Sequence, residues 1–293
     1  MSVQSAGRRG LVTRFPAPLR QARFARNRLA VAGLLVVAVF LLFCFVGPLL
    51  YSTDQTHTDL TQVNRAPGGA HWLGTDAVGH DQLGRLMYGG QVSLLVGLAA
   101  GVLATVIGTL WGAVAGYAGG WADAVMMRVV DAGIAIPALF ILLVVSAITT
   151  PDTVGLILVL GLVSWLVPSR LVRAETLTLK SRDYVLTLRA TGGTHSRAVT
   201  RHILPNSVST IAVAATFQVA DAILLVAYVS YLGLGVQPPK TDWGGMLSAG
   251  LTAAYSGRWW LIVPPGLAII LVVCAFNAIG DGLRDAFDVR GRG

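Results

Sequence analysis

Few residues of this chain are placed to do covalent chemistry. Glu175 is the only glutamate, so catalysis by a pair of glutamates is excluded. The five histidines all lie outside the apolar segments described below, whereas an intramembrane serine protease would need a histidine beside its nucleophile at membrane depth. These histidines are His57, His71, His80, His195 and His202. A membrane enzyme is therefore a disfavoured alternative.

Metal and nucleotide chemistry also lack their usual residues. Cys44 and Cys274 both lie in apolar segments, and the sequence has no His-Glu-x-x-His motif and no Cys/His cluster, so we expect no metal site. The two lysines are Lys180, which follows Leu179, and Lys240, which follows Pro239. Neither lies in a G-x-x-x-x-G-K-[ST] phosphate-binding loop, so this chain does not bind ATP by that route.

The polar segment 181–205 is the most promising functional feature. We expect a first helix over residues 183–191, with Ser181 as its N-cap and Asp183 in its first turn. Gly192 and Gly193 predict a sharp turn. This pattern favours a shaped helical hairpin that docks onto a partner, while a solvated basic loop is the alternative.

The second arm of the hairpin is expected to run from the turn to the next apolar segment. Thr194 is a suitable cap for a helix through Leu204, and Pro205 is expected to stop that helix.

The elements that carry this segment are apolar and long. The chain is 54% hydrophobic and only 12% charged, which indicates a polytopic membrane protein. About 20 apolar residues cross the hydrocarbon of a bilayer as a helix. Six such helices are predicted, at residues 29–51, 92–118, 132–150, 153–169, 206–234 and 259–280. The fold class is therefore all-α with six transmembrane helices.

Basic residues orient these helices. If the N-terminus is cytoplasmic, 18 of the 22 Lys and Arg residues fall on the cytoplasmic side, which agrees with the positive-inside rule. Both termini and residues 181–205 are then cytoplasmic, and the connections 52–91 and 235–258 are external. This layout explains the net charge of +8 better than a nucleic-acid partner does. The basic residues near the N-terminus also suit contact with membrane lipid.

Asp221 is an acid inside a predicted membrane helix. Counted from Asn206, it lies about 22 Å along that helix, in the outer half of the membrane. Acids inside membranes are costly and are candidates for functional sites. It is therefore a candidate for a translocation pathway, where its carboxylate would meet a cationic group; a structural hydrogen bond or a displaced membrane boundary are the alternatives.

Four ordered motifs resemble one family. Gly192 precedes HILPN (202–206) by the spacing of the cytoplasmic "EAA" loop of bacterial ABC importer permeases. HWLGTDAVGHD (71–81), SYLGLG (230–235) with Trp243-Gly244, and AFNAIGDGLRDAFD (275–288) resemble further motifs of the C-type permeases of dipeptide and oligopeptide importers. The resemblance covers about residues 25–290.

The resemblance implies a division of labour. The chain would be a non-catalytic permease in the bacterial cytoplasmic membrane, with a homologous second permease as its heterodimer partner and an extracytoplasmic substrate-binding protein. Two partner subunits would bind ATP and Mg and drive alternating access, and this chain would carry no cofactor. The ATPase-coupling element would comprise Tyr184, Arg189, Ala190, Gly192, Gly193 and Pro205.

The implied cargo is a dipeptide or an oligopeptide, although related systems also take nickel chelates and haem-like ligands. An ion-coupled secondary transporter is the alternative function. The chain departs from the family pattern where the Glu-Ala-Ala positions fall at Leu186, Thr187 and Leu188, and where the usual acid of the fifth helix falls at Val226.

We therefore divide the chain as follows: a basic cytoplasmic tail (1–28), the first transmembrane helix (29–51), an external loop (52–91), a five-helix core (92–281) with a cytoplasmic coupling loop (176–205) and an external loop (235–258), and a cytoplasmic C-terminal tail (282–293).

Overall fold

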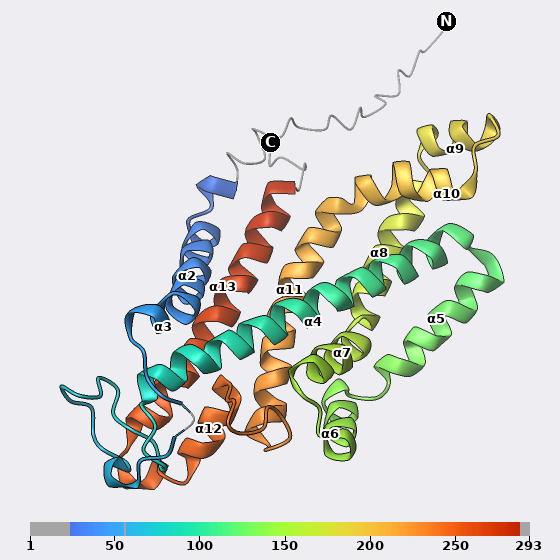
Figure 1. The fold of residues 1–293 in the computed structure, drawn as a ribbon. Helices are drawn as coiled ribbons and strands as arrows, with labels where there is room; N and C mark the ends of the chain where they lie inside the picture. Colours follow the sequence, from blue (N-terminus) through green and yellow to red (C-terminus); the bar gives the residue numbers. More distant parts are fainter. Residues whose placement is uncertain (1–23, 56, 288–293) are drawn as a thin grey trace, which may run out of the picture.

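The computed structural model describes residues 24–55 and 57–287, so the first part of the predicted N-terminal tail and the end of the C-terminal tail lie outside it (Figure 1). The described residues are helices and their connections, without a strand. Thr75 and Asp81 form an isolated antiparallel bridge. The predicted all-α class is confirmed.

Four helical segments are long and apolar enough to cross a membrane, judged by length and composition. They are α2 (Arg28–Phe45), α4 (Gln82–Ala118), the continuous segment His195–Tyr231 and the segment Trp259–Phe287. The segment His195–Tyr231 comprises α10 (His195–Ala198), η2 (Val199–Ile203) and α11 (Leu204–Tyr231). The segment Trp259–Phe287 comprises η4 (Trp259–Leu261) and α13 (Val263–Phe287).

The other two predicted membrane helices are broken. The first is α5 (Gly120–Ile134) followed by α6 (Ala138–Thr149), with a bend of 73°. Pro137 lies in this break, and a proline removes a backbone donor and clashes with the preceding turn. The second is α7 (Thr153–Ser164) followed by α8 (Leu166–Lys180), with a bend of 45°. The count is six only if each bent pair is one span.

The remaining helices are short and lie in the connections. They are α3 (Gly47–Leu50), η1 (Leu60–Gln62), α9 (Asp183–Ala190), α12 (Trp243–Leu251) and η3 (Ala254–Ser256). Several predicted boundaries move. The external loop predicted to end at residue 91 ends at Asp81, because the Asp81 carboxylate caps α4 by accepting from the Gly84 N–H at 2.8 Å. The first ten residues of α4 are too polar for hydropathy to detect.

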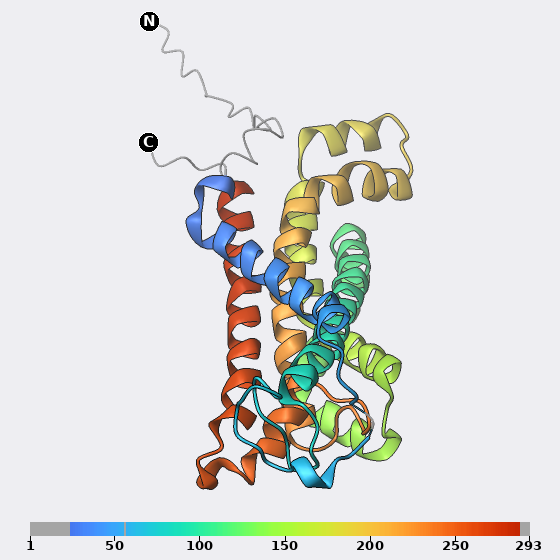
Figure 2. The ribbon, with the colours of Figure 1, turned by 60° about the vertical axis from the view of Figure 1, so that its left-hand side comes forward.

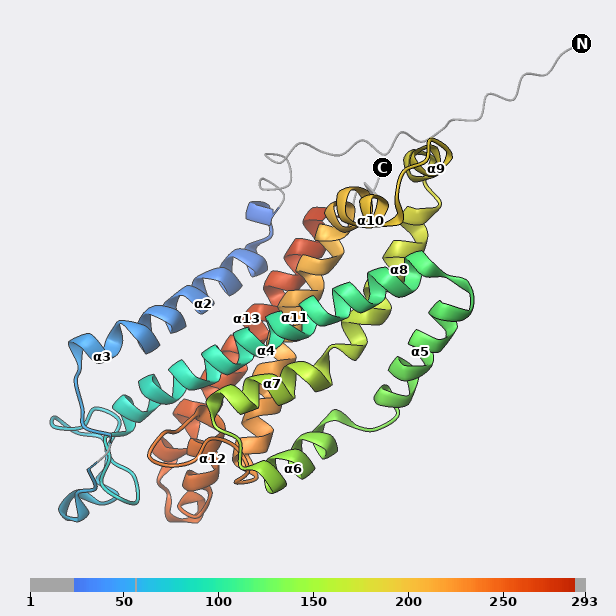
Figure 3. The same cartoon turned by 45° about the vertical axis from the view of Figure 1, so that its right-hand side comes forward.

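The connections gather at the two ends of the bundle. Figure 1 and Figure 2 show α9 and α10 as a hairpin projecting beyond one end of the long helices, while α12 and the connection between α3 and α4 lie at the opposite end. Figure 3 shows α4 crossing in front of α11 and α13, and α2 lies beside α13. The predicted docking loop and the predicted external loops are therefore on opposite faces.

The glycines of α4 set the close packing of this bundle. A β-carbon on Gly97 or Gly101 would meet Ile223 or Val219 of α11 within 3 Å. Gly108, Gly112 and Gly116 face α8 in the same way. A glycine face of this kind could pack inside the bundle or at a seam between subunits. It packs inside the chain, where small residues let membrane helices approach closely.

We expect Gly112→Ala to destabilise the protein. A β-carbon there would lie 2.3 Å from the backbone oxygen of Ser169, so α4 and α8 would have to separate. Overpacking of this kind costs about 1–3 kcal/mol. Gly266→Ala is the matched control, because its β-carbon would only touch Leu247 at 3.7 Å. Thermal unfolding in detergent should show a lower midpoint for Gly112→Ala alone; equal midpoints would refute the packing argument.

Candidate functional site

The hairpin between α8 and α11 has a defined turn. After α9, the Thr191 N–H donates to the Thr187 carbonyl at 3.0 Å and the Gly193 N–H donates to the Leu188 carbonyl at 2.9 Å. Gly192 has φ +82°, in the left-handed region that favours glycine. The predicted glycine turn is confirmed, and its conformation depends on Gly192.

Of the two helix caps predicted for the hairpin, Thr194 is confirmed and Ser181 is not. The Thr194 hydroxyl oxygen accepts from the Arg197 N–H at 3.3 Å, so Thr194 caps α10 as expected. Ser181 does not cap α9. Its hydroxyl donates to the Thr178 carbonyl at 2.9 Å, because Ser181 is the C-cap of α8.

The prediction that Pro205 stops the second arm was wrong. The chain passes without interruption from α10 through η2 into α11, and Pro205 lies in the first turn of α11. The segment η2 is a π-helical turn, in which the Leu204 N–H donates to the Val199 carbonyl. This wider turn moves backbone carbonyls away from the proline ring, so the helix continues.

The inner side of the hairpin packs against the ends of the membrane helices. Val185, Ala198 and Ile203 are fully buried. His195 Nδ1 lies 3.1 Å from the Tyr117 hydroxyl at the end of α4, and the Lys180 ammonium donates to the Tyr117 carbonyl. A displacement of the hairpin would therefore be transmitted to α4 and α8.

The outer surface of the hairpin is open to a partner. Tyr184 and Leu186 are 42% and 48% exposed, and the Tyr184 ring centroid lies 6.0 Å from that of His202. Ala190 and Gly192 are exposed as well. All four residues lie in α9 or in the turn that follows it, at one end of the bundle.

The other predicted coupling residues lie differently. Arg189 is in α9, and its side chain lies outside the described part of the structure. Gly193 is half-buried against Leu188. Pro205 lies at the base of the hairpin rather than at its turn. Leu186, where the family pattern has an acid, is an exposed apolar side chain in the middle of α9.

Asp221 lines a cavity where the two broken helices meet α11. The cavity has a volume of about 340 Å³. Its walls come from both sides of the α5–α6 break, including Pro137, and from both sides of the α7–α8 break. Gln218 and Tyr228 of α11 line it as well. Asp221 is exposed in this chain, whereas Val226, at the usual position of the family's acid, is buried in an apolar cluster.

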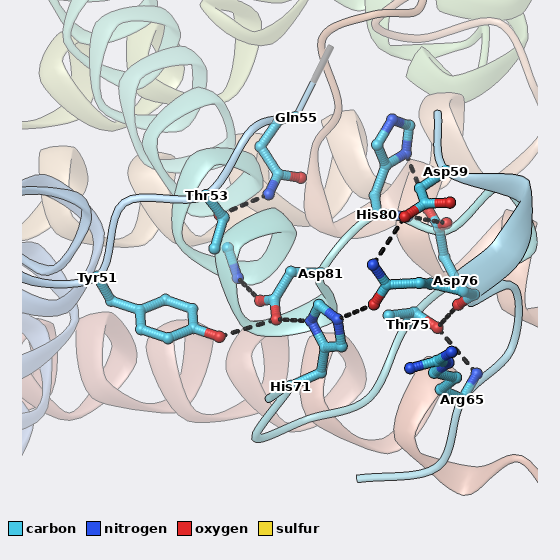
Figure 4. Close-up of polar contacts among 12 residues, drawn as sticks. Tyr51, Thr53, Gln55, Asp59, Arg65, His71, Thr75, Asp76, His80 and Asp81 are labelled. Atoms are coloured by element: carbon cyan, nitrogen blue, oxygen red, sulfur yellow. Dashed lines mark hydrogen bonds and ion pairs between the residues drawn. The ribbon is translucent and has the colours of Figure 1, made fainter. Parts of the chain in front are cut away.

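At the other end, Asp81 organises the external loop (Figure 4). Its carboxylate accepts from the Tyr51 hydroxyl at 2.9 Å and lies 2.8 Å from His71 Nδ1, in addition to capping α4. The second ring nitrogen of His71 lies 2.6 Å from the Gln62 side-chain oxygen. These contacts tie the loop to the start of α4. Nothing in the sequence indicated this network.

Asp76 forms a turn in the same loop. Its carboxylate accepts from the backbone N–H groups of Val78 at 2.9 Å and His80 at 2.8 Å. Arg85 of α4 pairs with Asp76 at 3.4 Å and lies 2.7 Å from His80 Nδ1. The loop is thereby a rigid cover over the end of α4.

Trp259 and Trp260 are adjacent aromatic residues of the kind that anchor a chain at the lipid interface, but Trp260 is not at the surface. Its side chain is 9% exposed, and its indole N–H donates to the Thr75 carbonyl at 3.3 Å. Trp260 therefore holds the external loop from below, while Trp259 is 54% exposed. Hydropathy cannot distinguish these two roles for adjacent tryptophans.

A buried acid at the start of α12 was not predicted. Asp242 is fully buried, accepts from the Ser230 hydroxyl at 2.5 Å and caps α12 by accepting from the Gly245 N–H at 2.7 Å. Burial raises the pKa of Asp242 to about 6, and its hydrogen bonds only partly offset that effect. The position of Asp242 directly before Trp243-Gly244 resembled any helix cap, so the sequence did not reveal its burial.

Stability is expected to depend on pH through Asp242. Because the pKa of Asp242 in the folded state is raised above its ordinary value of 3.8, the folded state binds the proton more tightly than the unfolded state. The stabilisation is therefore complete below pH 4 and is lost as the pH rises through about 6. Between pH 4 and 6 this effect lowers the thermal unfolding midpoint of the wild type as the pH rises, and Asp242→Asn should lack that part of the decrease. The same pH dependence of the midpoint in the variant and the wild type would contradict the role of Asp242.

A second missed contact is an ion pair between α5 and α8. Two guanidinium nitrogens of Arg173 donate to the two carboxylate oxygens of Asp123 at 2.5 and 2.6 Å. This bidentate pair joins α5, the first helix of one bent pair, to α8, the second helix of the other bent pair. Nothing in the spacing of 50 residues could have indicated it.

The chain matches a known family over most of its membrane core. Residues 108–293 match the family described as the binding-protein-dependent transport system inner membrane component, and residues 18–67 match the N-terminal transmembrane domain of oligopeptide transport permease C. The chain belongs to this permease family. The predicted family and the function class of a transport permease are confirmed.

Relatives of the permease cover nearly its whole length. It is 44% identical over 269 residues to a relative from Brucella suis biovar 1, which covers 92% of this chain and 89% of the relative. It is 40% identical over 272 residues to the oligopeptide transport system permease protein OppC of Escherichia coli K12, covering 92% and 90%. It is 36% identical over 266 residues to the dipeptide transport system permease protein DppC of Bacillus subtilis 168, covering 91% and 83%.

Proposed function

We propose that this permease forms half of the translocation pathway of an ATP-driven ABC importer for dipeptides or oligopeptides. The observation that carries the proposal is the hairpin, whose second arm contacts α4 through His195 and Tyr117 and whose outer surface is exposed. The names of the dipeptide and oligopeptide relatives support a peptide cargo. The permease has no covalent chemistry of its own.

The energy comes from other chains. Two ATPase subunits bind ATP and Mg, and one of them receives Tyr184, Arg189, Ala190 and Gly192 in a groove. Closure of the ATPases moves the hairpin, and the hairpin moves α4 and α8 as a rigid body, so that the pathway opens alternately to each side. The fixed contacts of the hairpin with Tyr117 support this route.

The remaining partners complete the pathway and deliver the cargo. A homologous second permease forms the other half as a heterodimer, and an extracytoplasmic binding protein docks at the face of α12 and the external loop. The complex lies in the bacterial cytoplasmic membrane, with the hairpin and both termini in the cytoplasm. The opposite placement of the hairpin and the external loop agrees with this orientation.

Asp221 is proposed to contact the cargo. Broken helices surround substrate sites in many membrane transporters because their ends expose backbone groups within the membrane. The cavity of Asp221 lies at two such breaks. A carboxylate there suits the protonated amino group of a peptide.

Asp221→Asn is expected to lower uptake of peptides with a free amino terminus by about tenfold, because it removes one charged hydrogen bond. Uptake of the corresponding N-acetylated peptide should be equal in the variant and the wild type. Competition between the two peptides in reconstituted vesicles checks this. Asp221 has no role in the pathway if free and acetylated peptides are affected alike or not at all.

Cross-linking tests the proposed docking of the hairpin. Leu186→Cys, at an exposed position of α9, should form a disulfide or a short cross-link with an ATPase subunit in the assembled complex. Lys240→Cys is the control, because Lys240 is exposed at the opposite end. Absence of any ATPase cross-link from Leu186→Cys and from Ala190→Cys would reject the proposal.

A further inference from the structure

An open groove lies beside the hairpin, at the end of α4. Its volume is about 600 Å³, and α4, α8, α10, η2 and the start of α11 form its walls. The apolar part of its lining includes Leu110, Val114 and Leu204. Its polar part includes Lys180 and His195. The groove is therefore apolar toward the membrane and cationic toward the hairpin.

The groove continues an apolar stripe along α4. Leu95, Val102, Val106, Leu110 and Val114 are each between 50% and 56% exposed. From Leu95 to Val114 the stripe rises about 29 Å, close to the thickness of the hydrocarbon of a bilayer. The stripe therefore follows α4 across the membrane and ends at Lys180 and His195.

The composition of the stripe favours lipid over a protein partner. The buried faces of α4 use Gly97, Gly101, Gly108 and Gly112 to approach α11 and α8. The exposed stripe is made of leucine and valine only. Membrane helices contact one another mainly through small residues, whereas larger aliphatic side chains suit acyl chains.

Lys180 provides the charge at the end of the stripe. Its ammonium donates to the Tyr117 carbonyl and lies 5.4 Å from the centroid of the Tyr117 ring. An ammonium has three donors, so two remain for an anion. His195 lies 3.1 Å from the Tyr117 hydroxyl through Nδ1, which leaves its other ring nitrogen for a second contact.

We propose that this groove binds an anionic phospholipid, with its phosphate at Lys180 and His195 and an acyl chain along Leu110 and Val114. His195 is the first residue of α10 and Lys180 the last of α8, so the lipid joins the membrane face of α4 to α8 and to the second arm of the hairpin. The site does not depend on the identity of the cargo or on the presence of ATPases.

The test measures lipid preference directly. The full permease, with the subunits that co-purify with it, is stripped of lipid in detergent. Native mass spectrometry then follows binding of phosphatidylglycerol and of phosphatidylcholine with the same acyl chains. We expect one site with about fivefold tighter binding of phosphatidylglycerol, the gain that one basic residue gives near an anionic headgroup.

The two lysines of the chain provide a matched pair of variants. Lys180→Gln should remove the preference for phosphatidylglycerol, and Lys180→Arg, which keeps the charge, should retain it. The comparison of these two variants separates an effect of the charge from an effect of misfolding. Lys240→Gln removes the same charge at the opposite end and should leave the preference unchanged. Val114→Trp should fill the groove and weaken binding of both lipids.

Two outcomes would overturn the proposal. One is a phosphatidylglycerol preference that survives Lys180→Gln or that Lys240→Gln removes equally. The other is cross-linking of Val114→Cys to a second permease in place of a photoreactive phosphatidylglycerol, which would make the groove a subunit seam.

Discussion

Gly192→Val is expected to abolish ATP-driven uptake while leaving membrane insertion and folding intact. Gly192 has φ +82°, and a β-branched residue there costs about 1–3 kcal/mol of backbone strain. Apart from its two chain neighbours, no atom of the described residues lies within 4 Å of a β-carbon built at this position, so the substitution causes no clash with them. The strain is relieved by opening the turn, which changes the pose of α9 relative to α10. We expect uptake and substrate-stimulated ATP hydrolysis to fall at least tenfold.

Gly257→Val is the control for strain alone. Gly257 has φ +71° and also has open space around it, but it lies in the external connection after η3. ATP hydrolysis by both variants is measured in proteoliposomes with and without substrate. Normal substrate-stimulated hydrolysis in Gly192→Val would contradict the proposed role of the turn.

Trp243→Ala is expected to cause the largest loss of stability. The Trp243 side chain is fully buried, and its ring centroid lies 5.7 Å from that of Phe40 in α2. Its indole N–H donates to the Leu86 carbonyl of α4 at 3.0 Å. Truncation leaves a cavity and removes the hydrogen bond to Leu86, at a cost of about 3–5 kcal/mol.

Thermal unfolding in detergent measures this effect. Trp121→Ala is the control, because Trp121 at the start of α5 is 80% exposed. The midpoint should fall by several degrees for Trp243→Ala and change little for Trp121→Ala. Similar shifts for both variants would show that α12 does not hold α2 and α4 together.

Helix positions were predictable where apolar length decides them. Residues 92–118 and 206–234 were found because they are long apolar runs. The first run lies inside α4, and the second ends three residues beyond Tyr231, the last residue of α11. The broken pairs were not predicted as bent, because hydropathy averages over Pro137. At Pro205 the sequence predicted a helix end that the structure lacks. A π-helical turn that contains the buried Ile203 accommodates the proline.

The candidate site was predictable where one residue type is required. Gly192 was found because a tight turn favours glycine, and Thr194 because a helix start favours a hydroxyl. The cavity of Asp221 was not, because its walls come from breaks in helices far apart in the sequence. Asp242 was missed for a related reason: its burial by the surrounding helices, rather than its local sequence, sets its pKa.

Uptake of a labelled peptide by proteoliposomes tests the central proposal most directly. The vesicles contain this permease with a second permease, two ATPase subunits and a binding protein, or the permeases alone with an imposed ion gradient. We predict accumulation only in the complete system, with ATP and Mg on the side of the hairpin. Accumulation by the permeases alone under an ion gradient, without ATPases, would contradict an ABC importer and indicate a secondary transporter.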